Sequence, residues 1–156
     1  MMCMHFTSSP LQLPCACTSL RKAARAVSRI YDDALASVGM TATQLAILRA
    51  IDRAGEDGVA LSQLAEGLVL EKTSLYRGLG PLLRSELIEV ATAAKGRAKF
   101  DRLTKAGRLA MERAAEPWEQ AQTRVVEAFG TVRWAALQPG VAALAETGVR
   151  LHARGL

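Results

Sequence analysis

The stretch LSQLAEGLVLEKTSLYRGLGPLLRSELIEV (residues 61–90) carries the pattern that decides the fold. Its first part, SQLAEGL, predicts a short helix with Ser62 as the cap, and a tight turn follows. A second helix is expected from about Lys72 to Ser85, although two glycines and a proline interrupt it. Each glycine costs about 1 kcal/mol relative to alanine, and an interior proline costs about 3 kcal/mol. Favourable contacts elsewhere must offset these costs if the helix is to form.

The two sides of this second helix differ in chemistry. At about 100° per residue, its leucines fall in one sector and form a predicted core face: Leu75, Leu79, Leu82 and Leu83. The opposite side carries hydroxyl, guanidinium and small residues: Thr73, Arg77, Gly80 and Arg84, with Ser74 and Pro81 beside them. A recognition helix needs such a stripe, because it offers donors to base edges and phosphates and approaches DNA closely.

A predicted hairpin follows the two helices. Residues 87–103 (LIEVATAAKGRAKFDRL) read as two short extended runs around a small, basic, glycine-containing tip. Alternation places Asp101 on the face of Leu103, an awkward position for a carboxylate. Residues 59–61 suffice only for an edge strand. Helix, turn, helix and basic-tipped hairpin together predict a winged helix-turn-helix.

Helices are expected on the N-terminal side of this unit. Apolar residues keep helical spacing from Leu20 to Val38, and Gly39 stands where a helix C-cap is expected. Thr41 and Gln44 form a capping-box pattern. They open a helix to about Arg53 with four predicted core residues: Leu45, Ile47, Leu48 and Ile51.

Long helices are also expected on the C-terminal side. Thr104 caps one that runs to Phe129, where Pro117 implies a kink or a missing backbone hydrogen bond. A last helical stretch, 131–152, is predicted to be divided by Pro139–Gly140.

Positive charge is concentrated in the predicted winged unit. Residues 71–108 contain nine Lys or Arg and four Asp or Glu, so this quarter of the chain accounts for the whole net charge of +5. Such a segment points to an anionic partner, although a solvated face can carry the same cluster.

Little in the sequence supports an enzyme, a metalloprotein, a membrane protein or a disulfide-rich protein. We find no paired carboxylates, phosphate loop or Cys–His arrangement, and His5 and His152 lack ligand spacing, so no enzyme, cofactor or metal is expected. Residues 1–14 lack a basic leader and a long apolar run, and no stretch is long enough to span a bilayer. Three cysteines make no disulfide framework. We expect a cytoplasmic protein without membrane contact.

The sequence resembles the MarR family of bacterial transcriptional regulators over about residues 15–150. The matching pieces are SLRKAARAVSRIYDDAL (19–35), GMTATQLAILRAI (39–51), the opening stretch (61–90), RLTKAGRLAM (102–111) and AEPWEQAQTRVVEAFG (115–130). The resemblance implies a homodimer with interlocked terminal helices, winged domains that each reach a major groove, and a small-molecule or oxidant response that releases DNA. A proline inside the recognition helix is usual in the branch it looks most like, which accounts for Pro81.

Two positions depart from the family pattern. Lys95, Gly96 and Arg97 stand where the wing usually carries Asp-x-Arg, so Arg97 can keep a minor-groove role while the orienting Asp is replaced by a cation. Gly78 stands where this branch often has Asn.

The expected fold class is mainly α, a winged helix-turn-helix domain with N- and C-terminal helices that form a dimerisation layer. The expected divisions are a flexible arm (1–14), an N-terminal dimerisation helix (15–38), the DNA-binding domain (39–104) and C-terminal dimerisation helices (105–156).

DNA contacts are expected from the recognition helix, the helix before it and the wing. Arg84 could instead join a surface pair, Tyr76 could pack within the domain, and Gln44 could serve only as a cap. The predicted contacts to double-stranded DNA are Thr43, Gln44, Lys72, Thr73, Ser74, Tyr76, Arg77, Arg84, Lys95, Arg97 and Lys99.

An effector pocket is expected where Arg25, Tyr31 and Trp118 come near the domain layer, with a cation and aromatic walls that suit an aromatic carboxylate. These residues could equally be structural. Cys15 and Cys17 are redox candidates, because Arg21, Lys22 or the positive end of a helix could lower a thiol pKa; packing at the dimer junction is the alternative.

The function expected from the sequence is a homodimeric repressor that reads a pseudo-palindromic operator and is released by a small molecule. A thiol-sensing repressor and a helical protein-interaction adaptor without DNA binding are the alternatives. The predicted dimerisation residues lie on apolar helix faces: Leu20, Trp118, Val125, Phe129, Trp134, Leu137 and Leu144.

Overall fold

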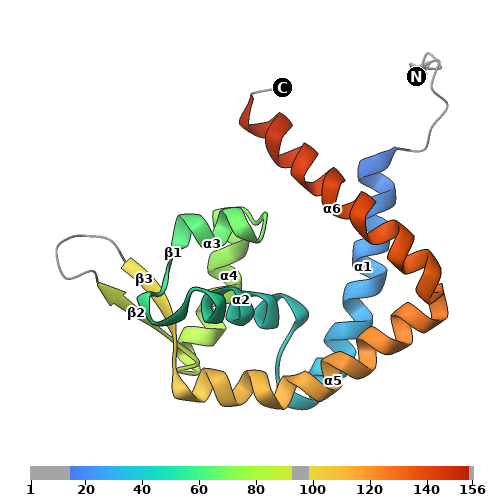
Figure 1. The fold of residues 1–156 in the computed structure, drawn as a ribbon. Coiled ribbons are helices and arrows are strands. Elements are labelled where there is room, and N and C mark those ends of the chain that lie inside the picture. The colour runs from blue at the N-terminus through green and yellow to red at the C-terminus, as the bar shows by residue number, and fades with distance from the viewer. Residues whose placement is uncertain (1–14, 93–98, 155–156) are drawn as a thin grey trace, which may run out of the picture.

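The computed structural model describes residues 15–92 and 99–154 (Figure 1). The elements, in chain order, are α1 (Ala16–Leu35), the 3₁₀ turn η1 (Ala36–Val38), α2 (Ala42–Arg53), the 3₁₀ turn η2 (Gly55–Asp57), β1 (Val59–Ala60), α3 (Leu61–Gly67), α4 (Lys72–Arg84), β2 (Ile88–Thr92), β3 (Lys99–Leu103), α5 (Lys105–Phe129) and α6 (Thr131–Ala153).

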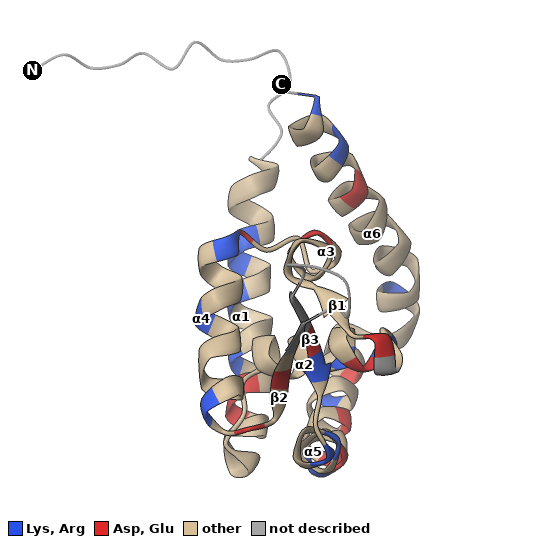
Figure 2. Cartoon of the chain, turned by 90° about the vertical axis from the view of Figure 1, so that its left-hand side faces the viewer, with Lys and Arg blue, Asp and Glu red and all other residues tan. Residues whose placement is uncertain are grey.

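The helices divide into a compact unit and a set of flanking helices. In Figure 1, α2, α3, α4 and the small sheet gather on one side, with the first part of α5 running beneath them. The rest of α5 bends upward to α6, and both α1 and α6 extend to the same end of the molecule in Figures 1 and 2. The core sits inside the compact unit and includes fully buried residues of three helices: Ile47, Leu48, Ile51, Leu64 and Leu75.

The sheet has the order β1-β3-β2, and both pairings are antiparallel. The β2–β3 register opposes Ile88 with Leu103, and both residues are buried. The predicted hairpin and edge strand are therefore confirmed, while the tip, 93–98, lies outside the described residues. The order of the helices and strands, together with the sheet, makes the compact unit a winged helix-turn-helix.

Local signals in the sequence fix several helix ends. Thr41 caps α2: its hydroxyl accepts from the Gln44 amide at 3.2 Å, and the Gln44 side chain accepts from the Thr41 amide at 2.9 Å. Gly39 adopts a left-handed conformation (φ 68°) at the end of η1, where glycine carries no steric cost. Thr104 caps α5 by accepting from the Gly107 amide at 3.0 Å.

Three sequence-based predictions are wrong. α3 begins one residue before Ser62, and its start is held by the Gln63 side chain, which accepts from the Ala60 amide at 3.3 Å. Leu83 is 39% exposed, because it lies at the edge of the leucine sector of α4. α6 continues through Pro139 without a break. The carbonyl that a proline frees one turn earlier lies on an exposed helix, where water can bond to it.

Among the described residues, no single helix is long and apolar enough to cross a membrane. The bent pair Ala16–Val38 and Ala42–Arg53, with 77° between its parts, passes the same length and composition test only when both parts are taken together.

The carboxylate of Asp101 is buried on the inner face of the sheet, as alternation predicts. Asp101 is only 6% exposed and lies between Val59 and Val90 in the register. Burial raises the pKa of this carboxyl above its ordinary value of 3.8.

We expect Asp101→Asn to stabilise the protein by about 1 kcal/mol at pH 7, since it removes a charge from a largely buried position. A raised folded-state pKa means that the folded state binds more protons than the unfolded state between pH 3.8 and the raised value. Wild-type stability should therefore fall as the pH rises through this window, and the variant should lose that dependence. Urea denaturation between pH 4 and 7 measures both effects, with the exposed Glu89→Gln as control. Equal pH dependence in Asp101→Asn and wild type would refute the expectation.

Candidate nucleic-acid interface

Helix α4 presents one apolar and one polar side, as its sequence predicts. Leu75, Leu79 and Leu82 are buried against the core. The predicted contact residues of this helix are all exposed: Lys72, Thr73, Ser74, Tyr76, Arg77 and Arg84. Figure 2 shows basic positions along α4 at one side of the molecule. The helix thus offers a continuous stripe of donors to solvent.

The two glycines of α4 serve different purposes. A methyl group at Gly78 would lie 2.5 Å from Ile47 Cδ1, so glycine lets α4 pack closely on α2. At Gly80 the nearest such contact is Arg84 Nη1 at 3.4 Å, on the exposed side. Close packing of α4 on α2 therefore explains why residue 78 is glycine, where the family branch often has Asn.

The start of α2 lies beside this stripe. Thr43 is exposed, and its Cγ2 lies 3.9 Å from the position of a methyl group on Gly78. Gln44 is half-buried, and its amide oxygen is used by the capping box. Gln44 is therefore a cap, and Thr43 is the better placed of the two for an external contact.

Of the predicted wing contacts, Lys95 and Arg97 lie outside the described residues. The backbone of Lys99 opens β3 opposite Thr92. The wing contacts therefore stay predictions.

The predicted effector residues are only partly brought together. The rings of Tyr31 and Trp118 lie 6.3 Å apart, and the Tyr31 hydroxyl bonds to the Gln122 side chain. Arg25 is exposed on α1. The cation at the aromatic pair is instead Arg49, whose guanidinium lies 4.1 Å from the centre of the Trp118 ring. Sequence reasoning missed Arg49, because nothing local in α2 signals a partner 69 residues later.

The two cysteines lie at the start of α1 and are exposed. The pKa of the Cys15 thiol is lowered, chiefly by hydrogen bonds from the side chain and backbone of Thr18. Neither Arg21 nor Lys22 is among the causes of this lowered pKa, whereas backbone hydrogen bonds at the start of α1, the other expected cause, are.

Most predicted dimerisation residues present apolar surface to solvent in the single chain. Leu20, Phe129, Leu137 and Leu144 are exposed, and Val125 and Trp134 are half-buried. Trp118 differs, since its contacts are with the core and Arg49 of its own chain. Exposed apolar residues also include Val132, at 84%, and Val141.

No protein-family model and no curated protein matches the sequence, but solved structures do. The Mycobacterium tuberculosis transcriptional regulator MosR is 31% identical, with a TM-score of 0.76 over 86% of this chain and 95% of that one. MosR in complex with DNA is 35% identical, with a TM-score of 0.69 over 85% and 98%. A regulator of the MarR family from Rhodococcus sp. RHA1 shares the fold at 18% identity and a TM-score of 0.72, over 81% and 89%.

The chain belongs to the MarR family. Its winged helix-turn-helix is the one that MarR-family regulators share. Both the family and the fold expected from the sequence are confirmed.

Proposed function

We propose that this chain is a DNA-binding transcriptional regulator that acts as a homodimeric repressor. The observation that carries the proposal is the exposed stripe of α4, with its leucines buried and its hydroxyl and guanidinium groups facing solvent. Arg77 can make bidentate bonds to a guanine, and Thr73 and Ser74 can bond to bases or phosphates. The structure of MosR bound to DNA, from a protein 35% identical over most of this chain, supports the same role.

The proposal includes a second copy of the chain. A helix layer that leaves Phe129, Leu137 and Leu144 exposed would gain free energy by burying them. A two-fold dimer buries the same face of each copy and presents two copies of α4, which suits an operator with two related half-sites. In this scheme 15–38 and 105–156 form the dimerisation layer and 39–104 the DNA-binding domain.

Two signals are candidates for releasing the protein from DNA. A small aromatic carboxylate could stack at the Tyr31–Trp118 pair and meet the charge of Arg49. The alternative is a thiol switch, favoured by the exposure and lowered pKa of Cys15. In that case peroxide would oxidise the Cys15 thiolate to a sulfenate and itself be reduced to water.

The proposal is tested by binding the purified protein to genomic fragments and then titrating salt against the fragment that it retains best. We expect a complex of two chains per duplex, by sedimentation, whose affinity falls steeply with salt because phosphate contacts release counterions. Peroxide added to wild type and to Cys15→Ser separates the two signals. Release of DNA from wild type but not from the variant favours the thiol switch, and no release from either leaves the small molecule.

A protein that retains no DNA even at low salt, and that recovers a protein partner instead, would contradict the proposal. That outcome is expected of the remaining alternative, a helical adaptor. No enzyme function is proposed.

A further inference from the structure

Three side-chain contacts join α1, α2 and α5 at one place, which we call the joint and define as Tyr31, Asp32, Arg49, Trp118 and Gln122. Tyr31 donates its hydroxyl hydrogen to Gln122 and thereby links α1 to α5. Asp32 Oδ1 accepts from the Ala42 amide at 2.7 Å and links α1 to the start of α2. Arg49 lies over Trp118 and links α2 to α5. The joint therefore connects α1, α2 and α5 to one another.

The contact between Arg49 and Trp118 crosses from α2, in the winged unit, to the middle of α5. Arg49 is half-buried, and burial together with repulsion from Arg53 lowers its pKa, while Glu119 acts in the opposite direction. A guanidinium keeps its charge under such conditions, and its attraction to an aromatic face strengthens as water is excluded. Arg49 thus lies over the Trp118 ring from within its own chain.

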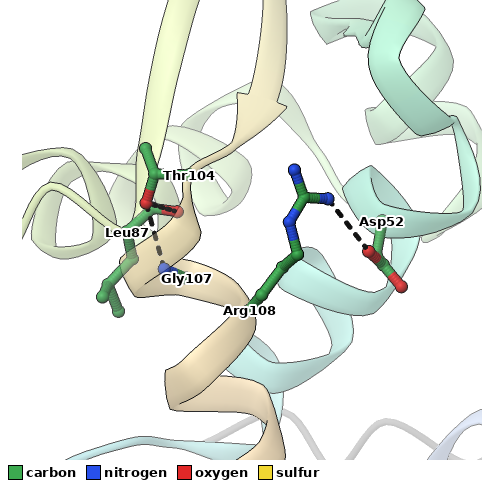
Figure 3. A network of polar contacts seen from close by, with 5 residues as sticks. All are labelled: Asp52, Leu87, Thr104, Gly107 and Arg108. Carbon is green, nitrogen blue, oxygen red and sulfur yellow. Dashed lines mark hydrogen bonds and ion pairs between the residues drawn. The ribbon is translucent and has the colours of Figure 1, made fainter.

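A second contact between the same helices is much weaker. Arg108 Nη1 lies 4.0 Å from Asp52 Oδ1, and both side chains are largely exposed (Figure 3). Ion pairs of this kind add little to stability or rigidity, since solvent screens them. Arg49 is half-buried, so solvent screens its contact with Trp118 less than it screens the exposed pair of Arg108 and Asp52.

The orientation of α4 follows from that of α2, because the two helices pack through Gly78 and Ile47. A fixed angle between α2 and α5 therefore fixes α4 relative to the flanking helices. In a two-fold dimer any change in this angle occurs twice and changes the separation of the two copies of α4.

We propose that Arg49 is a positioning residue that sets the half-site spacing at which the dimer binds. This inference rests on the proposed function, DNA binding as a homodimer. Arg49 touches no DNA in this scheme. It restricts which separations of two half-sites can be contacted together, and it leaves the contacts within each half-site unchanged.

The test uses duplexes with two half-sites at the natural separation and with one base pair inserted or removed, beside a duplex with a single half-site. For wild type, one inserted base pair should weaken binding at least tenfold, because a rigid dimer then cannot engage both sites. For Arg49→Gln this penalty should fall to about threefold or less, with single half-site affinity within about twofold of wild type. Arg49→Lys, which keeps a cation over the ring, should restore most of the penalty.

Two controls separate positioning from general effects. Arg53→Gln removes the same charge one turn later on an exposed position, and Asp52→Asn removes the exposed ion pair. Both should keep the wild-type penalty, and the melting temperature of each variant monitors the fold. The inference would be overturned if one inserted base pair weakened the binding of Arg49→Gln as much as that of wild type. It would also be overturned if Arg53→Gln tolerated the insertion as well as Arg49→Gln does. Failure of wild type to bind any half-site would instead overturn the proposed function.

Discussion

Replacing Gly107 by alanine should destabilise the protein by about 3 kcal/mol, because the added methyl group has no room. It would lie 2.1 Å from the carbonyl oxygen of Leu87 and 2.8 Å from Leu103 Cδ1. A backbone oxygen cannot rotate away as a side chain can. The start of α5 would have to separate from Leu87, just before β2 at the base of the wing.

The same close approach is held by hydrogen bonds that the separation would break. The Thr104 hydroxyl donates to the carbonyl oxygen of Glu86 at 2.7 Å. It also lies 3.1 Å from the carbonyl oxygen of Leu87 (Figure 3). The Thr104 amide also donates to the Leu87 oxygen at 3.1 Å. These bonds tie the first turn of α5 to the wing, so the loss includes more than the overlap of one methyl group.

Gly80→Ala is the matched control, since it makes the same change inside a helix with only Arg84 Nη1 nearby, at 3.4 Å. Alanine is the better helix former, so this variant should be neutral or more stable by up to about 1 kcal/mol. Urea denaturation at one protein concentration compares the two variants. Equal stabilities for Gly107→Ala and wild type would show that the start of α5 does not approach Leu87 as closely as described.

Local patterns predicted much of the fold correctly. The spacing of Leu75, Leu79 and Leu82 identified the buried side of α4, because a helix repeats its faces every 3.6 residues. Thr41 and Thr104 marked helix starts because their hydroxyl groups satisfy backbone amides within three residues. These interactions depend only on neighbours in the sequence.

Contacts between distant residues could not be read in the same way. Gly78 stood out as a poor helix former, but only the packed structure brings Ile47 against it. The predicted cation beside Tyr31 and Trp118 was Arg25, whereas Arg49 occupies that place. Three helices must be positioned relative to one another before the choice between these two arginines is decided, and periodicity within a helix carries no such information.

The second large effect is expected at the centre of the exposed stripe of α4. A bidentate bond from an arginine to guanine contributes about 1–3 kcal/mol of discrimination against other bases, and a two-fold dimer makes that contact twice. Arg77→Ala should therefore lower affinity for the operator by roughly 100-fold. Binding to an unrelated duplex should change much less, because phosphate contacts supply that binding.

The control for this variant is Arg124→Ala, which removes the same charge from an exposed position on the second half of α5. Its affinity for the operator should stay within about threefold of wild type, apart from a small general loss of positive potential. The comparison separates a specific contact from the effect of net charge.

The central claim is that the outward side of α4 lies in a DNA groove. The ratio of operator affinity to the affinity for a shuffled duplex, at physiological salt, tests this claim most directly. For Arg77→Ala we expect the ratio to fall by roughly 100-fold, while Arg124→Ala retains the wild-type ratio. An Arg77→Ala protein that folds normally and keeps the wild-type ratio would contradict the account.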